Sequence, residues 1–225
     1  MRWRNIITGA VLGGVSLGMA PGFTAQAQAA CPRVAAPVVS VQVIDPGPRV
    51  SSTNSIQQIN VMDGGHGLQR PGFRVLGMTR IKVLRTYDVR YRTRPVAGGF
   101  CVHVDNVSVK FGLKDHTVLV PREYARGSCQ FRFIVRHEMA HVDVNRRTAR
   151  KYATVLKNEM RSALRRAGAS SDTSAVRAQN AQTAVMQKVI DDVIGRFHTE
   201  RTALHDKIDD PNNAKYAAKG KCNGW

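Results

Sequence analysis

A long stretch without proline or glycine, residues 131–166, constrains the fold of this chain more than any other feature of its sequence. Apolar and histidine side chains recur within it at every third or fourth position, as they do on one face of an amphipathic helix. Small residues interrupt the pattern at 167–174, and a second helix is expected at 175–208, ahead of Pro211. Two long helices with so short a connection should pack antiparallel.

The part of the chain that precedes these helices is rich in strand-forming residues. Short runs of them occupy residues 38–44, 73–76, 81–84, 87–92, 100–104, 107–111 and 117–120. Turn-forming residues separate the later runs at 95–99, at Asp105–Asn106 and at Lys114–Asp115. Because these connections are too short for crossover helices, we expect antiparallel pairing.

Strands followed by helices are typical of the α+β class. The sequence therefore predicts one α+β domain over residues 30–225, with an antiparallel β-rich part at 38–120 and two long antiparallel helices within 130–210. A length of 225 residues fits one domain of this kind.

The first 29 residues have the pattern of a secretory signal peptide. Two arginines precede an apolar stretch at 6–23, and small residues follow it. We expect cleavage after Ala27 or Ala29; the alternatives are an uncleaved membrane anchor and a lipid attached to Cys31. The pattern predicts a bacterial protein that is periplasmic or secreted.

The chain has four cysteines, and none of them forms a Cys-x-x-Cys pair, which excludes a cysteine-based zinc finger. In an exported protein an even number of cysteines predicts disulfides, and four residues allow three pairings. We favour Cys101–Cys129, which would join the strand region to the start of the first helix. The other bond, Cys31–Cys222, would then join the two ends of the mature chain.

The strong positive charge of the chain bears on the kind of partner that it can bind. The sequence has 34 Lys and Arg residues against 16 Asp and Glu residues, a formal net charge of +18. Such a charge often indicates nucleic-acid binding, but an exported protein rarely meets its own chromosome. We therefore expect no nucleic-acid partner, no integral membrane segment after signal cleavage, and an anionic polymer or lipid surface of the envelope as the electrostatic partner. The alternative is a charge that only keeps the protein soluble.

One motif carries the chemistry: residues 137–141 fit the pattern His-Glu-x-x-His. Two histidines four residues apart project from the same face of a helix, so His137 and His141 can bind one metal ion. Imidazole ligands suit Zn²⁺, which tolerates an open position for water. Glu138 lies about 100° away around the helix and can take a proton from a water molecule that the zinc activates. The alternative is two buried histidines that form only hydrogen bonds.

A catalytic zinc needs a third protein ligand. Glu159 lies on the same unbroken helix, about 27 Å from His141 at a rise of about 1.5 Å per residue, so it could be a ligand only if the helix stopped and reversed near residues 145–147, which the sequence does not indicate. On the second helix, Glu200 lies opposite the motif and near the apolar stripe, so it is the predicted third ligand. His205 and then His198 are the next candidates, and a plain salt bridge is the alternative role of Glu200.

Residues 137–141, together with the preceding segment 126–133, resemble the zincin metallopeptidases. More narrowly, the chain is similar to a family of secreted bacterial proteins of unknown function that are predicted to be zinc-dependent proteases. Gly99-Phe100-Cys101, Val120-Pro121 and Asp143 stand at comparable places, and the similarity covers about residues 78–160. The resemblance implies zinc and suggests proteolysis without naming a substrate. The chain lacks the third histidine of metzincins and the Asn-Glu-x-x-Ser-Asp box of the thermolysin type.

These features predict an exported zinc metallopeptidase with one Zn²⁺ ion. Water activated by the zinc and by Glu138 would attack a peptide or amide bond of a peptide or an envelope polymer. Arg201 and Tyr216 are candidates for stabilising the developing oxyanion. The alternative is a non-catalytic, zinc-binding, basic envelope protein that keeps the histidine pair.

Overall fold

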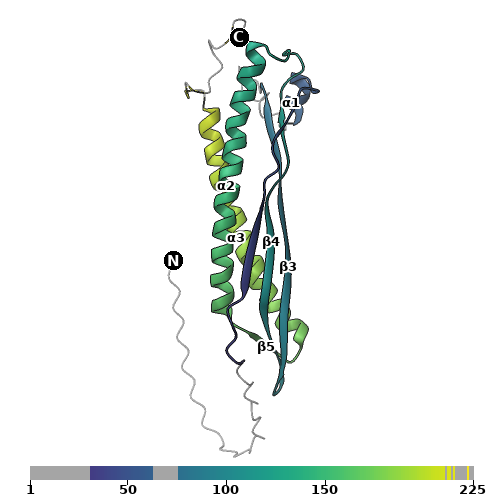
Figure 1. Ribbon diagram of the computed structural model, residues 1–225, viewed down its shortest axis with the longest axis vertical. Helices are drawn as coiled ribbons and strands as arrows, with labels where there is room; N and C mark the ends of the chain where they lie inside the picture. Colours follow the sequence, from purple (N-terminus) through teal and green to yellow (C-terminus); the bar gives the residue numbers. More distant parts are fainter. Residues whose placement is uncertain (1–30, 63–75, 211, 214, 216–221, 223–225) are drawn as a thin grey trace, which may run out of the picture.

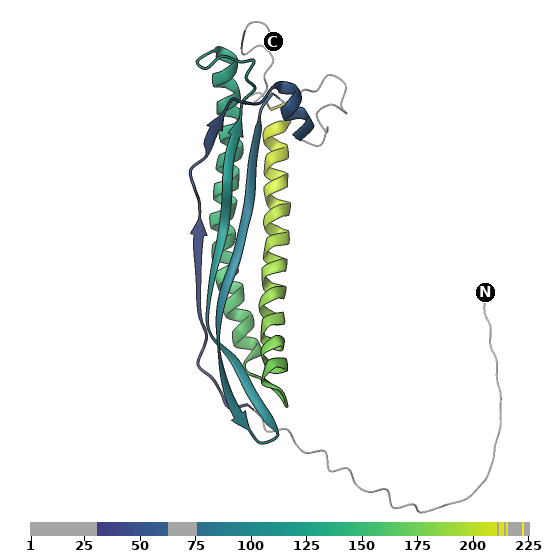
Figure 2. The same ribbon diagram turned by 90° about the vertical axis from the view of Figure 1, so that its right-hand side faces the viewer.

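The computed structural model describes residues 31–62, 76–210, 212, 213, 215 and 222, so the predicted signal peptide and residues 73–75 lie outside the described part. The elements are β1 (Val38–Ile44), β2 (Arg49–Ser51), α1 (Ile56–Met62), β3 (Met78–Val96), β4 (Gly99–Leu119), α2 (Cys129–Ala167), β5 (Ser170–Asp172) and α3 (Ala175–Asp209). The long helices α2 and α3 lie side by side against one face of a single elongated sheet (Figures 1 and 2). The α+β prediction is therefore confirmed at the level of fold class.

Both long helices lie close to where the periodicity places them. Ser128 caps α2, since its hydroxyl accepts a hydrogen bond from the backbone N–H of Phe131. At the other end Gly168 follows the helix with φ 61°, in the left-handed region that favours glycine, and its N–H donates to the carbonyl of Leu164. Ser174 caps α3 in the same way as Ser128 caps α2.

The prediction of a purely antiparallel sheet is wrong. The strands β3 and β4 form an antiparallel hairpin, but β1 and β2 both pair with β4 in parallel, with Val38 opposite Asn106 and Arg49 opposite Thr117. Short connections constrain only strands that follow one another along the chain. Between β2 and β4 the chain runs the whole length of the sheet as β3 and then reverses, so β4 runs in the same direction as β1 and β2.

The short runs predicted between residues 81 and 120 merge into the two long strands β3 and β4. Only the turn formers at 95–99 make the hairpin turn, where Gly98 has φ 80°. The other two pairs of turn formers, Asp105–Asn106 and Lys114–Asp115, lie at two shifts of the β3–β4 register. An extra residue on β4 at each shift is a β-bulge, and Asp115 adopts φ 56° in one of them.

The bulges keep the apolar residues of β4 on the side of the helices. Each extra residue changes the alternation by one, so the residues of β4 in the two apolar clusters are even-numbered at Val104, odd-numbered from Val107 to Leu113, and even-numbered again at Val118 and, just after the strand, at Val120. The main core lies between this strand and both helices. At its centre the ring of Phe197 meets those of Phe111 and Tyr152 edge to face, with centroids 5.6 and 5.9 Å apart.

All four cysteines form disulfides, but the pairing that we favoured from the sequence is wrong. The bonds join Cys31 to Cys101 and Cys129 to Cys222. Cys101 lies near the hairpin turn, whereas α2 begins beyond the other end of β4. A strand of this length separates Cys101 from Cys129 by about 60 Å, and a disulfide requires Cα atoms within about 7 Å.

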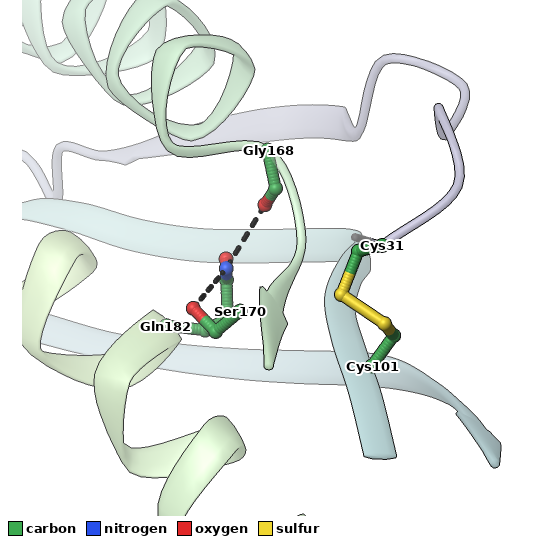
Figure 3. The surroundings of a disulfide bond; sticks show 5 residues. All are labelled: Cys31, Cys101, Gly168, Ser170 and Gln182. Atoms are coloured by element: carbon green, nitrogen blue, oxygen red, sulfur yellow. Dashed lines mark hydrogen bonds between the residues drawn. A yellow bond between two sulfur atoms is a disulfide. The ribbon is translucent and has the colours of Figure 1, made fainter. Parts of the chain in front are cut away.

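The Cys31–Cys101 bond lies at the end of the molecule where α2 connects to α3. Figure 3 shows the bond beside the buried side chain of Gln182, which donates hydrogen bonds to the carbonyl of Gly168 and the hydroxyl of Ser170. The two disulfides are consistent with an oxidising, exported compartment. No helix within the described residues combines the length and the apolar character that a membrane span requires.

Candidate metal centre

One face of α2 carries a row of buried polar side chains. Glu138, His141, Asn145 and Thr148 follow one another at spacings of three or four residues, and each is at most 7% exposed. Spacings of three and four place residues on the same side of a helix. A buried polar group without a hydrogen-bond partner is costly, so the partners of these four side chains indicate the role of this face of the helix.

Three donor atoms converge at the start of this row. Nε2 of His137 lies 3.2 Å from Nε2 of His141, and Oδ1 of Asp209 lies 3.1 and 2.9 Å from these two nitrogens. Ligands about 2.0–2.1 Å from a tetrahedral Zn²⁺ ion would be about 3.3 Å apart. The triangle thus has nearly the size of one face of such a coordination shell, and these residues could hold a metal ion.

Asp209 is the last residue of α3, and its side chain is 47% exposed. Burial raises the pKa of its carboxyl group, but the hydrogen bonds to His137 and His141 outweigh burial and hold the pKa below its usual value. The carboxylate is therefore ionised, as a metal ligand must be. Its exposure leaves one side of the triangle open to solvent.

Glu200, the third ligand predicted from the sequence, lies elsewhere. Its carboxylate accepts hydrogen bonds from Nζ of Lys151 at 2.5 Å and from the hydroxyl of Tyr152 at 2.9 Å. The hydrogen bond from Lys151 lowers the pKa of Glu200 most, and the hydrogen bond from Tyr152 lowers it further. The prediction placed the helix-to-helix turn near residue 169, whereas the real connection includes β5, so residues farther along α3 face the motif.

His205, the next candidate, contacts the other side of the His141 ring. Nδ1 of His205 lies 2.6 Å from Nδ1 of His141, and its Nε2 lies 2.9 Å from Oδ1 of Asn145. Arg201 can only donate, and its contact with the same Asn145 atom agrees with that atom being the amide oxygen.

This chain of contacts sets the tautomers of both imidazole rings. Because Oδ1 of Asn145 accepts, Nε2 of His205 carries a proton and donates it. Burial lowers the pKa of His205 to about 4, so the ring is neutral and its Nδ1 accepts from Nδ1 of His141. His141 therefore carries a proton on Nδ1, which leaves its Nε2, the nitrogen that faces the donor triangle, as the one that can bind a metal ion.

Glu138 lies beside the triangle without belonging to it. The hydroxyl of Thr79 donates to its Oε2 at 2.8 Å. A Cβ atom on Gly77 would lie only 2.8 Å from its Oε1, so the glycine makes room for the carboxylate. Burial, more than any other cause, raises the pKa of Glu138, while the nearby His141 and His137 oppose the shift.

The remaining candidates from the sequence have other contacts. Glu159 lies on the unbroken helix α2 and forms an ion pair with Arg196, and His198 packs against the ring of Phe197. Arg201 lies over that same ring and donates to Asn145. Tyr216 lies outside the described residues.

Sequence reasoning missed Asp209, the carboxylate nearest the two histidines. The sequence does contain a signal that could have indicated Asp209. His205 and Asp209 are four residues apart near the end of the second helix, just as His137 and His141 are four residues apart near the start of the first. On antiparallel helices these two pairs come face to face.

Comparison of the chain with protein-family models, with curated proteins and with solved structures finds no match. Function therefore has to be inferred from the site itself.

Proposed function

We propose that this protein is a metal-dependent hydrolase of peptide or amide bonds, with zinc held by His137, His141 and Asp209. The observation that carries the proposal is the triangle of Nε2, Nε2 and Oδ1 atoms, 2.9–3.2 Å apart, next to a buried glutamate. Two neutral imidazoles and one carboxylate are a donor set that Zn²⁺ accepts in hydrolytic sites, with a fourth position for water.

When bound, the zinc ion would polarise the scissile carbonyl and lower the pKa of water. Among the residues of the chain, Glu138 would transfer the proton. Thr79 holds its Oε2, which leaves Oε1 to accept the proton of the attacking water. A carboxyl group with a raised pKa accepts a proton from the attacking water and returns it to the departing amine near neutral pH. His205 and Asn145 hold the ring of His141 in the orientation that ligation needs.

Metal analysis of the mature protein tests the ligand set. We expect about one zinc ion per chain, and Asp209→Ala should lower the zinc content strongly because two imidazoles alone bind weakly. Glu200→Ala is the matched control, since it removes a carboxylate from the same helix that contacts Lys151 instead. Zinc retained by Asp209→Ala but lost from Glu200→Ala would contradict the assignment.

Hydrolysis of a peptide library, read by mass spectrometry, tests the activity. We expect cleavage that a chelator abolishes, and Glu138→Gln should remove it while leaving the zinc content unchanged. Zinc without any cleavage would favour the second candidate, a non-catalytic zinc-binding protein of the envelope. Cleavage that survives Glu138→Gln would contradict the role of that residue.

A further inference from the structure

The sheet has an outer face, the one turned away from α2 and α3; within the described residues the short helix α1 reaches this face at one end, where Sδ of Met62 lies 3.8 Å from a guanidinium nitrogen of Arg80 (Figure 2). In β3 the odd-numbered apolar residues from Ile81 to Tyr91 pack on the core, which leaves most even-numbered side chains pointing outward. Seven exposed basic residues lie on the outer face: Arg80, Lys82, Arg90, Arg92 and Arg94 of β3, with Lys110 and Lys114 of β4.

The same face also carries three carboxylates, Asp88, Asp105 and Asp115, which neutralise only part of this charge. Asp105, at one of the two bulges, pairs with both Arg90 and Arg92 at 3.0 and 3.1 Å. At the other bulge, Asp115 reaches Lys82 at 3.8 Å. For the other four basic residues of the face, the described residues supply no ion pair; these are Arg80, Arg94, Lys110 and Lys114.

The sheet also places like charges together. Lys82 lies directly opposite Lys114 in the antiparallel ladder, and like charges in this position destabilise a sheet. Asp115 reaches only Lys82 of this pair, and at the long distance of 3.8 Å, so part of the positive charge stays uncompensated by the described residues. The same strands carry Arg80 and Lys110 nearby, so the excess charge continues along the ribbon.

The length and twist of the hairpin indicate the shape of the anion. From Arg80 to Arg94 the row extends about 45 Å at about 3.3 Å per residue. A long two-stranded ribbon twists, and β-bulges increase the twist, so the outer face turns along its length. A flat bilayer can contact only part of such a surface, whereas a flexible chain can follow it.

We propose that the outer face binds a linear polyanion, an extended polymer that carries phosphate or carboxylate groups at regular intervals. This binding does not depend on the metal centre, which lies on the opposite side of the sheet against the helices. It keeps the protein on an anionic polymer of the envelope by contacts with many charges, each of them weak.

Binding of fluorescently labelled polyphosphate to the mature protein, measured by anisotropy at several salt concentrations, tests the proposal. The variant Lys110→Gln/Lys114→Gln removes two charges from the outer face. The control Lys157→Gln/Arg161→Gln removes two exposed charges from α2 and leaves the same net charge. We expect affinity to fall about tenfold in the first variant and the salt dependence to weaken by about one to two counterions.

The control should lose no more than about threefold in affinity, since it changes only the overall field. Equal losses in both variants would overturn the proposal, because net charge alone would then explain binding. Tighter binding to vesicles of anionic phospholipid than to polyphosphate would overturn it in favour of a membrane surface. Both variants should keep the melting temperature of the parent protein, and Lys114→Gln relieves a repulsion, so loss of fold does not confuse the result.

Discussion

At the scale of single residues, His141 joins the candidate metal centre to the interior of the molecule. Its Nε2 faces Asp209 and its Nδ1 faces His205, which in turn is held by Asn145. Replacing a residue that orients a metal ligand in this way commonly lowers the affinity for the metal, even though the residue does not touch the ion.

Replacing His205 therefore has a measurable effect. We expect His205→Ala to weaken zinc binding by about 10–100-fold, because Nδ1 of His141 loses the acceptor that fixes its tautomer. Competition with a chromophoric chelator measures the affinity. His198→Ala is the control on the same helix, since that ring packs on Phe197 and has no contact with the triangle. An unchanged affinity in His205→Ala would show that the tautomer is set by other contacts.

Gly77 controls the position of Glu138. In Gly77→Ala the new Cβ would lie 2.5 Å from Cγ2 of Ile134 and 2.8 Å from Oε1 of Glu138. We expect the carboxylate to move, hydrolysis to fall by at least about tenfold and zinc content to stay the same. Gly47→Ala, where the structure has nothing within 4 Å of the added Cβ, should keep full activity. Equal rates in the two variants would contradict the positioning role.

The sequence predicts the residues of the site unequally. His137, Glu138 and His141 lie within one helical turn or so, and their spacing alone fixes their common face. Asp209 depends on how two long helices are aligned, and a short strand in the connection, β5, shifted that alignment away from Glu200. Asn145 and Thr79 are ordinary polar residues whose role appears only when the partner elements are in place.

At the scale of elements, the long helices were predictable because periodicity accumulates over many turns, whereas the strands were not. Turn formers inside β4 indicated chain reversals, yet Asp105 and Asp115 lie in bulges where an extra residue is accommodated. Local composition cannot separate a bulge from a turn. The parallel partners β1 and β2 depend on contacts distant in sequence, which no local pattern reveals.

Asp45 fastens the connection after β1 to α2. Its carboxylate accepts hydrogen bonds from Arg146 at 2.9 and 3.0 Å and from Arg150 at 2.7 Å, and the buried His116 lies nearby on β4. Burial raises the pKa of Asp45, but the hydrogen bonds with Arg150 and Arg146 outweigh burial and lower it. A lowered pKa in the folded state stabilises the fold above the unfolded-state pKa of about 4, and this contribution disappears as pH falls.

We therefore expect Asp45→Asn to reduce the free energy of unfolding by about 1–3 kcal/mol at neutral pH. The difference from the parent protein should shrink as pH falls below about 4, because the parent then loses its ionised carboxylate as well. Denaturant titrations at several pH values measure it. Asp143→Asn is the control, since its pair with Arg147 is mostly exposed and should contribute less than about 0.5 kcal/mol. A pH-independent difference would contradict the assigned cause.

At the scale of the whole molecule, the two disulfides lie at opposite ends of the long axis. Cys31–Cys101 holds the end with the hairpin turn, and Cys129–Cys222 ties the chain that follows α3 to the start of α2. The candidate metal centre lies near the second bond, since His137 is only about two helical turns from Cys129. Asp209, as the last residue of α3, is at a position where helices fray unless they are held.

Removing either disulfide should therefore lower the stability of the fold by a similar amount, but only the removal of Cys129–Cys222 should weaken metal binding. In the chain-entropy model, closed loops of 70 and 93 residues each contribute about 4–5 kcal/mol, so both double Cys→Ala variants should melt at clearly lower temperatures. Zinc affinity should fall only when Cys129 and Cys222 are replaced, because Asp209 then loses the bond that restrains the end of α3. Calorimetry and zinc competition at a temperature where both variants are folded measure the two effects. If both variants bound zinc as tightly as the parent protein, packing of α3 against α2 would be sufficient to hold Asp209 in the triangle.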